Sequence, residues 1–261
     1  MSKMQKNAPR VCKNALICAL GEQFEGVLVR VFDEIDSTNT EAKRMTFDGF
    51  FGDALLVANS QTAGRGRMGR SFYSPSGTGA YFSILHTLTT PLCDAVAITS
   101  AASVAVMRAI RTLTGIQTEI KWVNDLYYNK KKVCGILTEA VSAGESAHVI
   151  VGIGINLDTA DFPEELQGIA GSLGAPIDTA VLIAEVSRQI LICLQNPSER
   201  EWLSDYCAHS CVLGKKIAWT EAGVTRQGIA EMIDEDGALL VKDEKNELVR
   251  LHTGEISVRS L

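Results

Sequence analysis

Hydrophobic and polar residues follow two kinds of pattern along the chain. Short runs that are apolar throughout, or apolar at every second position, predict β-strands, because successive side chains of a strand point to opposite faces of a sheet. Before residue 200, six such runs stand at 26–35, 54–58, 79–88, 117–123, 133–141 and 148–156. Several of them are bounded by glycine, asparagine or lysine clusters, so we expect separate strands.

Longer apolar stretches predict helices. Residues 94–113 are rich in alanine and apolar on most sides, which is typical of a helix buried against a sheet, and Gly115 would end it. Residues 178–195 predict a second apolar helix with Asp178 as its N-cap, and 199–208 predict a third. A strand-rich centre with these helices on one side predicts the α+β class, with a mixed or antiparallel sheet, and not a regular βαβ repeat.

The pattern changes after Gly214. Five short alternating runs follow, separated by glycine, aspartate and glutamate turns, and they predict a small β-barrel. A unit of that size is marginally stable alone, so we expect it to dock on the main domain. The predicted organisation is therefore an N-terminal extension (1–25), a main domain (26–211) and a C-terminal β-barrel (212–261).

Composition and charge narrow the class of protein. The chain has 261 residues, 46% hydrophobic and 21% charged, which is ordinary for a globular protein. Its formal net charge of −6 argues against a dedicated nucleic-acid or membrane-surface binder, because such proteins present basic surfaces. Seven scattered cysteines fit free thiols in a reducing compartment. No apolar run looks long enough to span a membrane, so we expect a cytoplasmic protein.

One short segment of the chain gathers residue types that can ligate a metal ion. Cys207, His209 and Cys211 lie close together but lack the spacing of structural zinc sites and a fourth ligand nearby. We therefore expect no metal site built from protein side chains.

The most unusual stretch is GRGRMGR, Gly64–Arg70, which places three arginines and three glycines in an acidic chain. Arginine offers a planar fork of donors that matches carboxylates and phosphates, and glycine lets a backbone approach a ligand closely. The stretch satisfies GxGxxG and nearly matches a P-loop, but both motifs must open a helix. Pro75, Gly77 and Gly79 follow instead, so we predict a flexible loop that orders around an anion. A solvated charged turn is the alternative for this stretch alone.

Six blocks of the sequence, in order, resemble one family, the biotin–protein ligases. They are 36–39 (DSTN), 61–75 (QTAGRGRMGRSFYSP), 121–126 (KWVNDL), 132–139 (KVCGILTE), 152–156 (GIGIN) and 254–259 (GEISVR). The blocks cover nearly the whole chain at comparable spacing. Two positions depart from the family pattern, since Val123 replaces a proline and Phe72 stands where a tryptophan is common.

The resemblance implies a catalytic domain of the biotin/lipoate ligase type at 26–211 and an SH3-like barrel at 212–261. Too few residues precede the first predicted strand for the helix-turn-helix domain of the family's regulatory members. The resemblance therefore implies the short form, which binds no nucleic acid. Family members are often dimers, so a homodimer is an expectation that the residues themselves do not decide.

The activity implied by the resemblance is ATP-dependent attachment of biotin to a lysine of a biotin carboxyl carrier protein, through biotinyl-5′-AMP. Its first step brings a carboxylate against a polyphosphate, so fixed positive charge and Mg²⁺ are expected to offset the repulsion. Arg65, Arg67 and Lys132 are the expected cationic clamps. Asp125 is the candidate base that takes the proton of the acceptor lysine.

The resemblance also implies which residues bind each substrate. Those expected at biotin are Ser37, Thr38, Asn39, Gln61, Arg65, Gly66, Arg67, Lys132 and Gly135. Those expected at the nucleotide are Arg67, Arg70, Phe72, Lys121, Trp122, Asn124, Lys132 and Asn156. Taken alone, residues 37–39 favour a plain cap of a short helix that ends near Met45. Trp122 alone favours a core position, and a turn is an equal alternative for residues 124–125.

Two other functions stay open at this point. A lipoate–protein ligase or octanoyl transferase would share the fold and the kind of acceptor, but its motifs are not the pair GRGRxGR and KWxND. A binding-only protein that senses biotin or a nucleotide would need the same pocket without turnover.

Overall fold

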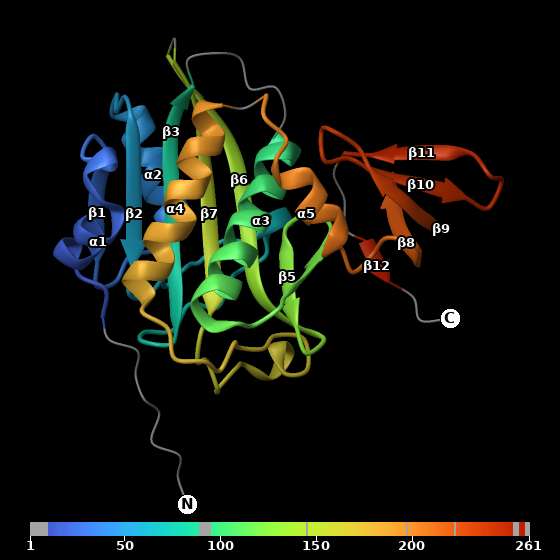
Figure 1. Cartoon of the computed structure of the whole chain (residues 1–261), viewed down its shortest axis with the longest axis horizontal. Coiled ribbons are helices and arrows are strands. Elements are labelled where there is room, and N and C mark those ends of the chain that lie inside the picture. Colours follow the sequence, from blue (N-terminus) through green and yellow to red (C-terminus); the bar gives the residue numbers. More distant parts are fainter. Residues whose placement is uncertain are drawn as a thin grey trace, which may run out of the picture.

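A seven-stranded sheet with the order β1-β2-β3-β7-β6-β5-β4 forms the centre of the protein (Figure 1). The computed structural model describes residues 10–88, 95–144, 146–196, 198–221, 223–252 and 256–258. The strands are β1 (Leu28–Phe32), β2 (Asp53–Ala58), β3 (Gly79–Leu88), β4 (Glu119–Lys121), β5 (Asp125–Tyr128), β6 (Lys131–Ala143) and β7 (Ser146–Asn156). Only β1 and β2 pair in parallel, and the other neighbours in this sheet are antiparallel. The predicted mixed sheet of an α+β fold is confirmed.

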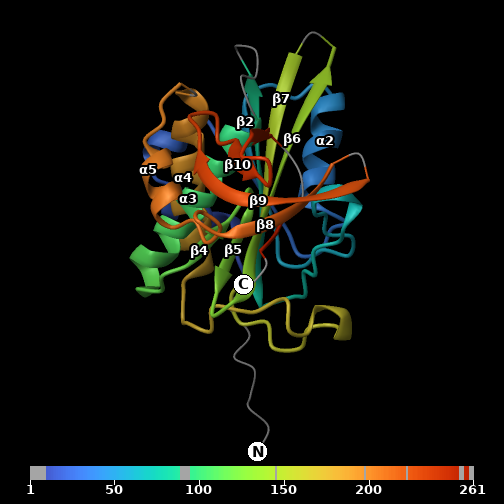
Figure 2. The same ribbon diagram turned by 90° about the vertical axis from the view of Figure 1, so that its right-hand side faces the viewer.

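Helices cover both faces of this sheet (Figure 2). On one face lie α1 (Lys13–Leu20), α3 (Ala95–Thr114), α4 (Thr179–Gln195) and α5 (Trp202–Ala208), and on the other lies α2 (Thr38–Phe47). Strands covered on both faces lose the alternation of half-buried strands. This explains why the sequence of β2 is a continuous apolar run, since its residues 54–58 are all at most 2% exposed.

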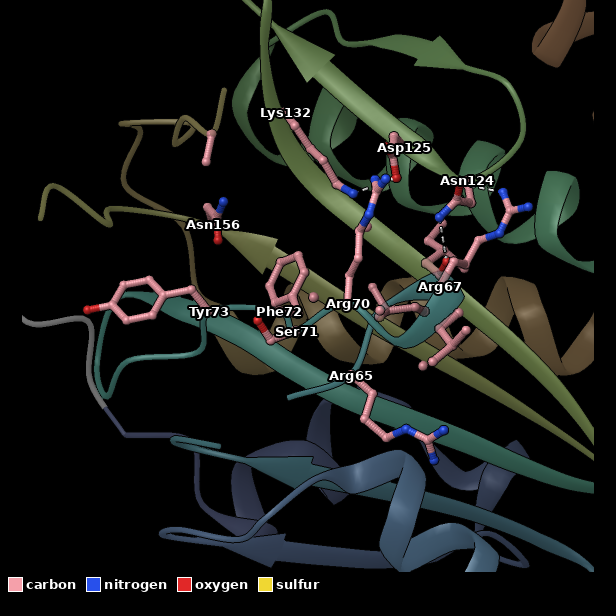
Figure 3. Close-up of a pocket in the computed structure, with 18 of the residues that line it drawn as sticks. Arg65, Arg67, Arg70, Ser71, Phe72, Tyr73, Asn124, Asp125, Lys132 and Asn156 are labelled. Atoms are coloured by element: carbon pink, nitrogen blue, oxygen red, sulfur yellow. Dashed lines mark hydrogen bonds and ion pairs between the residues drawn. The ribbon is translucent and has the colours of Figure 1, made fainter. Parts of the chain in front are cut away.

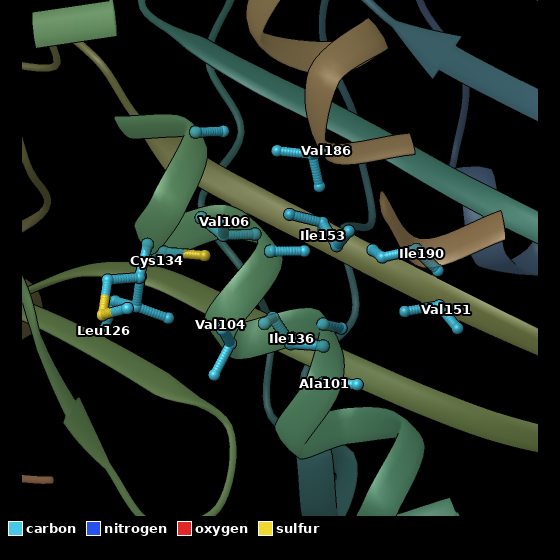
Figure 4. Close-up of a cluster of buried hydrophobic side chains, with 14 of the residues drawn as sticks. Ala101, Val104, Val106, Leu126, Cys134, Ile136, Val151, Ile153, Val186 and Ile190 are labelled. Atoms are coloured by element: carbon cyan, nitrogen blue, oxygen red, sulfur yellow. The ribbon is translucent and has the colours of Figure 1, made fainter. Parts of the chain in front are cut away.

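The main core fills the space between the sheet and the helix pair α3 and α4. In Figure 4, Val106 of α3 faces Ile153 of β7, and Val186 of α4 lies beside the same strand. Asp178 caps α4 as predicted, because its carboxylate accepts from the backbone N–H groups of the first turn. The opposite face has a smaller apolar cluster, in which α2 packs on β2, β3 and β7.

The long helix α3 corrects one expectation of the sequence analysis. Among the described residues it is the one helix whose length and apolar composition would suffice to cross a membrane, whereas we expected no such segment. However, 78% of that stretch is buried, against β6, α4 and α5. Helix α3 is therefore buried to the extent expected of a helix in a protein core. The predicted first residue of this helix, Asp94, lies outside the described residues.

Between residues 117 and 141 the prediction was incomplete. The strand predicted over 117–123 is limited to β4, and a turn at residues 122–124 joins it to a further strand, β5, so the turn alternative holds for Asn124 but not for Asp125. A second turn follows at Asn129 and Lys130, whose φ angles of 50° and 62° suit a tight β-hairpin. Only Leu126 of β5 is fully buried, so this strand carries little apolar signal in the sequence.

The N-terminal segment belongs to the same packed body. Helix α1 packs on α4 and β1, and Arg188 of α4 donates to the carbonyl oxygens of Ala19 and Leu20 at its end. Upstream, the side-chain amide of Asn59 bonds to both backbone groups of Val11, at 3.0 and 3.3 Å. The sequence showed only a short apolar patch here, and we predicted no helix.

All five runs predicted after Gly214 are strands of a second, antiparallel sheet. They are β8 (Lys216–Glu221), β9 (Val224–Ile233), β10 (Leu239–Asp243), β11 (Leu248–Leu251) and β12 (Ile256–Val258). Ile217 and Leu239 of this sheet belong to the same apolar cluster as the core of the main domain. The indole N–H of Trp122 donates to the carbonyl oxygen of Gly237 at 2.9 Å across the contact. The small domain is therefore docked, as predicted.

Two buried tryptophans allow a matched test of this contact. The indole N–H of Trp122 is bonded to Gly237, whereas that of Trp219 is buried without a partner among the described residues. Trp122→Phe orphans a buried carbonyl oxygen and should lower the free energy of unfolding by about 1–2 kcal/mol. Trp219→Phe removes an unsatisfied donor and should lower it far less. Urea denaturation measures both, and equal losses would show that the Trp122 bond does not stabilise the docking.

Candidate active site

A cavity of about 560 Å³ opens on the sheet face that carries α2 (Figure 3). Every residue that the sequence analysis assigned to the reaction or to either substrate lines it. They are Ser37, Thr38, Asn39, Gln61, Arg65, Gly66, Arg67, Arg70, Phe72, Lys121, Trp122, Asn124, Asp125, Lys132, Gly135 and Asn156. Residues from blocks far apart in the sequence are thus gathered around one space, although their individual roles stay predictions.

Glycines on β6 and β7 form the floor of the cavity. Gly135 and Gly154 are paired across the two strands, and Gly152 follows on the same face. A β-carbon on Gly154 would overlap the ring of Phe72, and one on Gly152 would overlap the amide of Asn39. On the other face of β7, Ile153 and Ile155 are buried in the main core. The GIGIN block therefore fills one face of the sheet and leaves the other open.

The loop that carries the arginines is folded back on itself. Isolated bridges pair Gln61 with Ser74 and Arg65 with Ser71, and Gly66 N donates to Arg70 O at 2.7 Å. The tip is one turn of 3-10 helix over Arg67–Gly69, with Met68 and Gly69 at positive φ. The stretch that we predicted to be a flexible loop thus has the shape of a short hairpin. Its change of order on binding an anion stays a prediction.

The arginines of this hairpin point in two directions. Arg67 Nη1 donates to Asn124 Oδ1 at 3.0 Å, and Figure 3 shows Arg70 beside Asp125 and Lys132. Arg65 points away from that group, toward α2. The hairpin therefore sends two cations to one end of the cavity and one cation to the other.

Asn124 ends the turn before β5, Asp125 is the first residue of β5, and Lys132 lies on the neighbouring strand β6. Lys132 Nζ lies 2.7 Å from Asp125 Oδ1, an ion pair without the alignment of a hydrogen bond. Asn124 Nδ2 donates to the carbonyl oxygen of Ile136 at 2.9 Å, which leaves its oxygen for Arg67. The cationic groups of Arg67 and Lys132 are thus both oriented by neighbours that also line the cavity.

At the α2 end, polar side chains are buried and bonded to one another. Thr38 N donates to Gln61 Oε1 at 2.9 Å, and Gln61 Nε2 donates to Ser74 Oγ at 2.9 Å. Ser83 Oγ lies 2.7 Å from Thr38 Oγ1. Ser37 precedes the helix, but its side chain makes no capping bond, so the plain-cap alternative for residues 37–39 is not supported. Buried polar groups of this kind suit a polar ligand.

A carboxylate missed by the sequence analysis joins this corner to the hairpin. Glu139 of β6 accepts from Asn39 Nδ2 at 3.0 Å and from Lys43 Nζ at 2.7 Å, and Arg65 Nη2 lies 3.3 Å away. Burial alone would raise the pKa of Glu139, but the bonds from Lys43 and Asn39 and the charges of Lys43 and Arg65 outweigh it and hold the pKa below its usual value.

The opposite wall combines an amide with apolar side chains. Asn156 is 4% exposed, its Nδ2 donates to Gly171 O at 3.0 Å, and its Oδ1 has no partner among the described residues. The rings of Tyr73 and Phe162 lie 6.3 Å apart at this wall, which Leu166 and Ile169 continue. Residues 157–174 contain no motif or hydrophobic period from which this wall could be predicted.

Trp122 is both a core residue and a cavity-lining residue, the two positions that the sequence analysis considered for it. It is 3% exposed, as a core residue would be, and it also contributes to the cavity lining. Next to it, the ammonium of Lys121 lies 5.6 Å from the ring centroid of Tyr127, a cation–π arrangement. Tyr127 also lines the cavity, but its strand was not predicted.

Comparison with known proteins agrees with this arrangement. The biotin/lipoate A/B protein ligase family matches residues 31–156, and the biotin protein ligase C-terminal domain matches 212–259. The bifunctional ligase/repressor BirA of Bacillus subtilis is 34% identical over 263 residues, which cover 95% of this chain and 79% of that protein.

Two further relatives are matched over nearly their whole length. The biotin–[acetyl-CoA-carboxylase] ligase of Paracoccus denitrificans is 32% identical, over 79% of this chain and 91% of its own. The biotin protein ligase of Aquifex aeolicus, solved with biotin and ATP, superposes with a TM-score of 0.73 at 27% identity, covering 89% of this chain and 98% of that one. The chain therefore belongs to the biotin/lipoate A/B protein ligase family, as one of its biotin protein ligases.

Proposed function

We propose that this ligase activates biotin with ATP and transfers it, through biotinyl-5′-AMP, to a lysine of a biotin carboxyl carrier protein. The observation that carries the proposal is the division of one cavity into a buried polar corner, a group of cations and an apolar wall with one open acceptor. The polar corner matches the ureido ring of biotin, the cations match its carboxylate and the phosphates of ATP, and the apolar wall matches adenine. A lipoyl or octanoyl chain has no group that would use the polar corner.

Biotin fits with its ureido ring at the corner made by Ser37, Thr38, Asn39 and Gln61. Their hydrogen-bonding groups are buried, so an analogue without ureido donors and acceptors would leave some of them unpaired. The glycine floor at Gly135, with Gly66 of the hairpin, leaves room for the chain of biotin to run toward the cations.

The nucleotide fits against the opposite wall. Asn156 Oδ1 is an acceptor, and the exocyclic amine of adenine is a donor of the right kind for it. Phe72 and Trp122 offer aromatic surfaces, and Lys121 and Arg70 also line the cavity.

The carboxylate of biotin then attacks the α-phosphorus of ATP, and pyrophosphate leaves. Arg67 and Lys132 stand where both anions meet, so they offset the repulsion and align the reactants. Arg65 is the third predicted clamp, although its guanidinium is turned toward Glu139. The cavity wall and the hairpin keep water from the acyl-phosphate.

In the second step the acceptor amine attacks the acyl carbon and AMP leaves. The amine must lose a proton, and Asp125 is the carboxylate that lines the cavity among the described residues. Its ion pair with Lys132, at 2.7 Å, holds the carboxylate in place at the cavity.

Mg²⁺ would neutralise charge on the phosphates of ATP. Among the described residues, no group of three or more histidine, cysteine, aspartate or glutamate side chains could hold a metal ion. This donor set fits Mg²⁺ bound mainly by phosphate oxygens and water, with Asp125 as a further oxygen ligand.

The remaining features of the proposal concern the setting of the reaction. The six described cysteines are all free thiols, which supports a cytoplasmic location. The acidic net charge supports a protein acceptor and not a nucleic acid. Assembly as a homodimer is compatible with the reaction but is not required by the cavity.

Two assays test the function directly. Purified protein should catalyse biotin-dependent exchange of labelled pyrophosphate into ATP, and should make a carrier domain detectable by streptavidin. Replacing biotin with lipoate or octanoate should abolish both signals. Exchange with lipoate would favour the lipoate ligase, and biotin binding without exchange would favour the binding-only protein.

Removal of the Arg67 side chain should weaken retention of the adenylate without affecting the fold. Arg67→Ala deletes a charge-assisted donor, so dissociation of biotinyl-5′-AMP should accelerate about 10–100-fold while the melting temperature stays within a few degrees. Arg30→Ala is the control, because Arg30 pairs with Glu41 away from the cavity. Stopped-flow release of the adenylate measures the effect. Wild-type release from Arg67→Ala would refute the clamp.

A single methyl group on the cavity floor should disturb the nucleotide site. Gly154→Ala would push the Phe72 ring from its place, so KM for ATP should rise about tenfold. Gly26→Ala is the matched control, since its β-carbon would have no neighbour within 4 Å. In a Phe72→Ala background the Gly154 substitution should add little. Additive effects on KM in that background would contradict the assignment.

A further inference from the structure

Glu139 is a carboxylate that the proposed chemistry does not use. It lies on β6 two residues beyond Leu137, which lines the cavity, and therefore on the same face of the sheet. Its side chain is 17% exposed and contacts three partners from two other parts of the chain, Asn39 and Lys43 of α2 and Arg65 of the hairpin. A carboxylate buried to this degree has to be paired, and here it is paired more than once.

The first consequence is that Glu139 fixes the orientation of the Asn39 amide. An ionised carboxylate can only accept, so the NH₂ group of Asn39 must face Glu139. The same NH₂ group reaches Leu137 O at 3.4 Å, and the amide oxygen accepts from Ser83 Oγ at 2.6 Å. Without the charge, the amide could turn over and offer its other face to the corner.

The orientation is passed on along a chain of hydrogen bonds. Because the one proton of Ser83 Oγ goes to Asn39, this hydroxyl accepts from Thr38 Oγ1 at 2.7 Å, and Gln61 Oε1 accepts from Thr38 N at 2.9 Å. Each hydroxyl has one proton to donate, so the direction of one bond restricts the next. The charge at one end therefore decides which groups of the biotin corner are donors and which are acceptors.

The second consequence concerns the hairpin. The bridges within it hold its shape but do not attach it to α2. The ion pair of Arg65 with Glu139 attaches the hairpin to β6, at 3.3 Å, and Lys43 of α2 holds the same carboxylate oxygen, so that the hairpin is linked to α2 through Glu139. One carboxylate thus contacts both the ureido corner and the hairpin that covers the cavity.

We propose that Glu139 is a positioning residue of the ligase, which orients the Asn39 amide for biotin and ties the arginine hairpin, through Arg65, to β6 and by way of Lys43 to α2. The inference rests on the proposed function, because it names a residue that serves the biotin end of that cavity. It predicts a selective defect. Biotin binding depends on Glu139, whereas Asn156 and the nucleotide wall have no contact with it among its described partners.

Glu139→Gln tests the proposal, with Glu41→Gln as the matched control. Glu41 is 18% exposed and pairs with Arg30 and Arg44, so it resembles Glu139 in burial and in charge, but its ion pairs involve neither Asn39 nor the arginine hairpin. In the pyrophosphate exchange assay, Glu139→Gln should raise KM for biotin about tenfold and change KM for ATP less than about twofold. Glu41→Gln should change neither.

Trypsin gives a second readout that a merely structural role would not move. Arg65, Arg67 and Arg70 are tryptic sites, so a hairpin released from α2 should be cut faster in Glu139→Gln than in Glu41→Gln or wild type. Combining Asn39→Ala with Glu139→Gln should produce less than the sum of the two single effects on biotin binding. Equal rises in both KM values, or unchanged tryptic cleavage, would overturn the proposal.

Lys43→Met keeps the proposal testable if Glu139→Gln does not fold. Lys43 holds Glu139 from α2 and does not line the cavity, so its loss should raise KM for biotin in the same direction by a smaller factor. An unchanged KM for biotin in Lys43→Met would then overturn the proposal. Wild-type protein without exchange activity would instead refute the proposed function, so the two failures are distinguishable.

Discussion

Repulsion between like charges is the constraint on which this active site depends. A cavity that has to bring a carboxylate and a polyphosphate together needs several cations, and two unit charges 4 Å apart interact by about 4 kcal/mol near a protein surface. The structure offsets this with resident carboxylates. Asp125 pairs with Lys132 at one end, and Glu139 pairs with Lys43 and Arg65 at the other. An acidic chain can thereby keep a locally cationic cavity before either substrate arrives.

The sheet also has to leave space for the cavity on one of its faces. A strand in the middle of a covered sheet normally fills both faces, yet the cavity needs one face empty. Alternating glycines on β7 achieve this, because Gly152 and Gly154 leave the α2 face open while the isoleucines between them complete the core. The same empty face receives the Phe72 ring and the Asn39 amide, so the floor of the cavity and the side chains above it fit each other closely.

Much of the fold and of the cavity lining could be predicted from the sequence, because the hydrophobic period, the turn residues and the motifs are local features of the chain. The GIGIN run, the Asp178 cap and the five C-terminal strands follow from period and turn residues, and the structure confirms these elements. What could not be read depends on contacts distant in the chain. Helix α1 is stabilised by Arg188 of α4, and the wall around Phe162 has no period of its own. Glu139 lay within the predicted strand 133–141 without a signal of its own, because its partners Asn39 and Lys43 are about 100 residues away in sequence.

The central claim is that one cavity holds the whole adenylate, with biotin at the α2 corner and adenine at Asn156. A crystal structure with a non-hydrolysable analogue of biotinyl-5′-AMP tests it most directly. The account predicts the ureido ring within hydrogen-bond distance of Thr38 and Gln61, and the linker that replaces the phosphate between Arg67 and Lys132. An analogue bound outside this cavity, or with its ends reversed, would contradict the account.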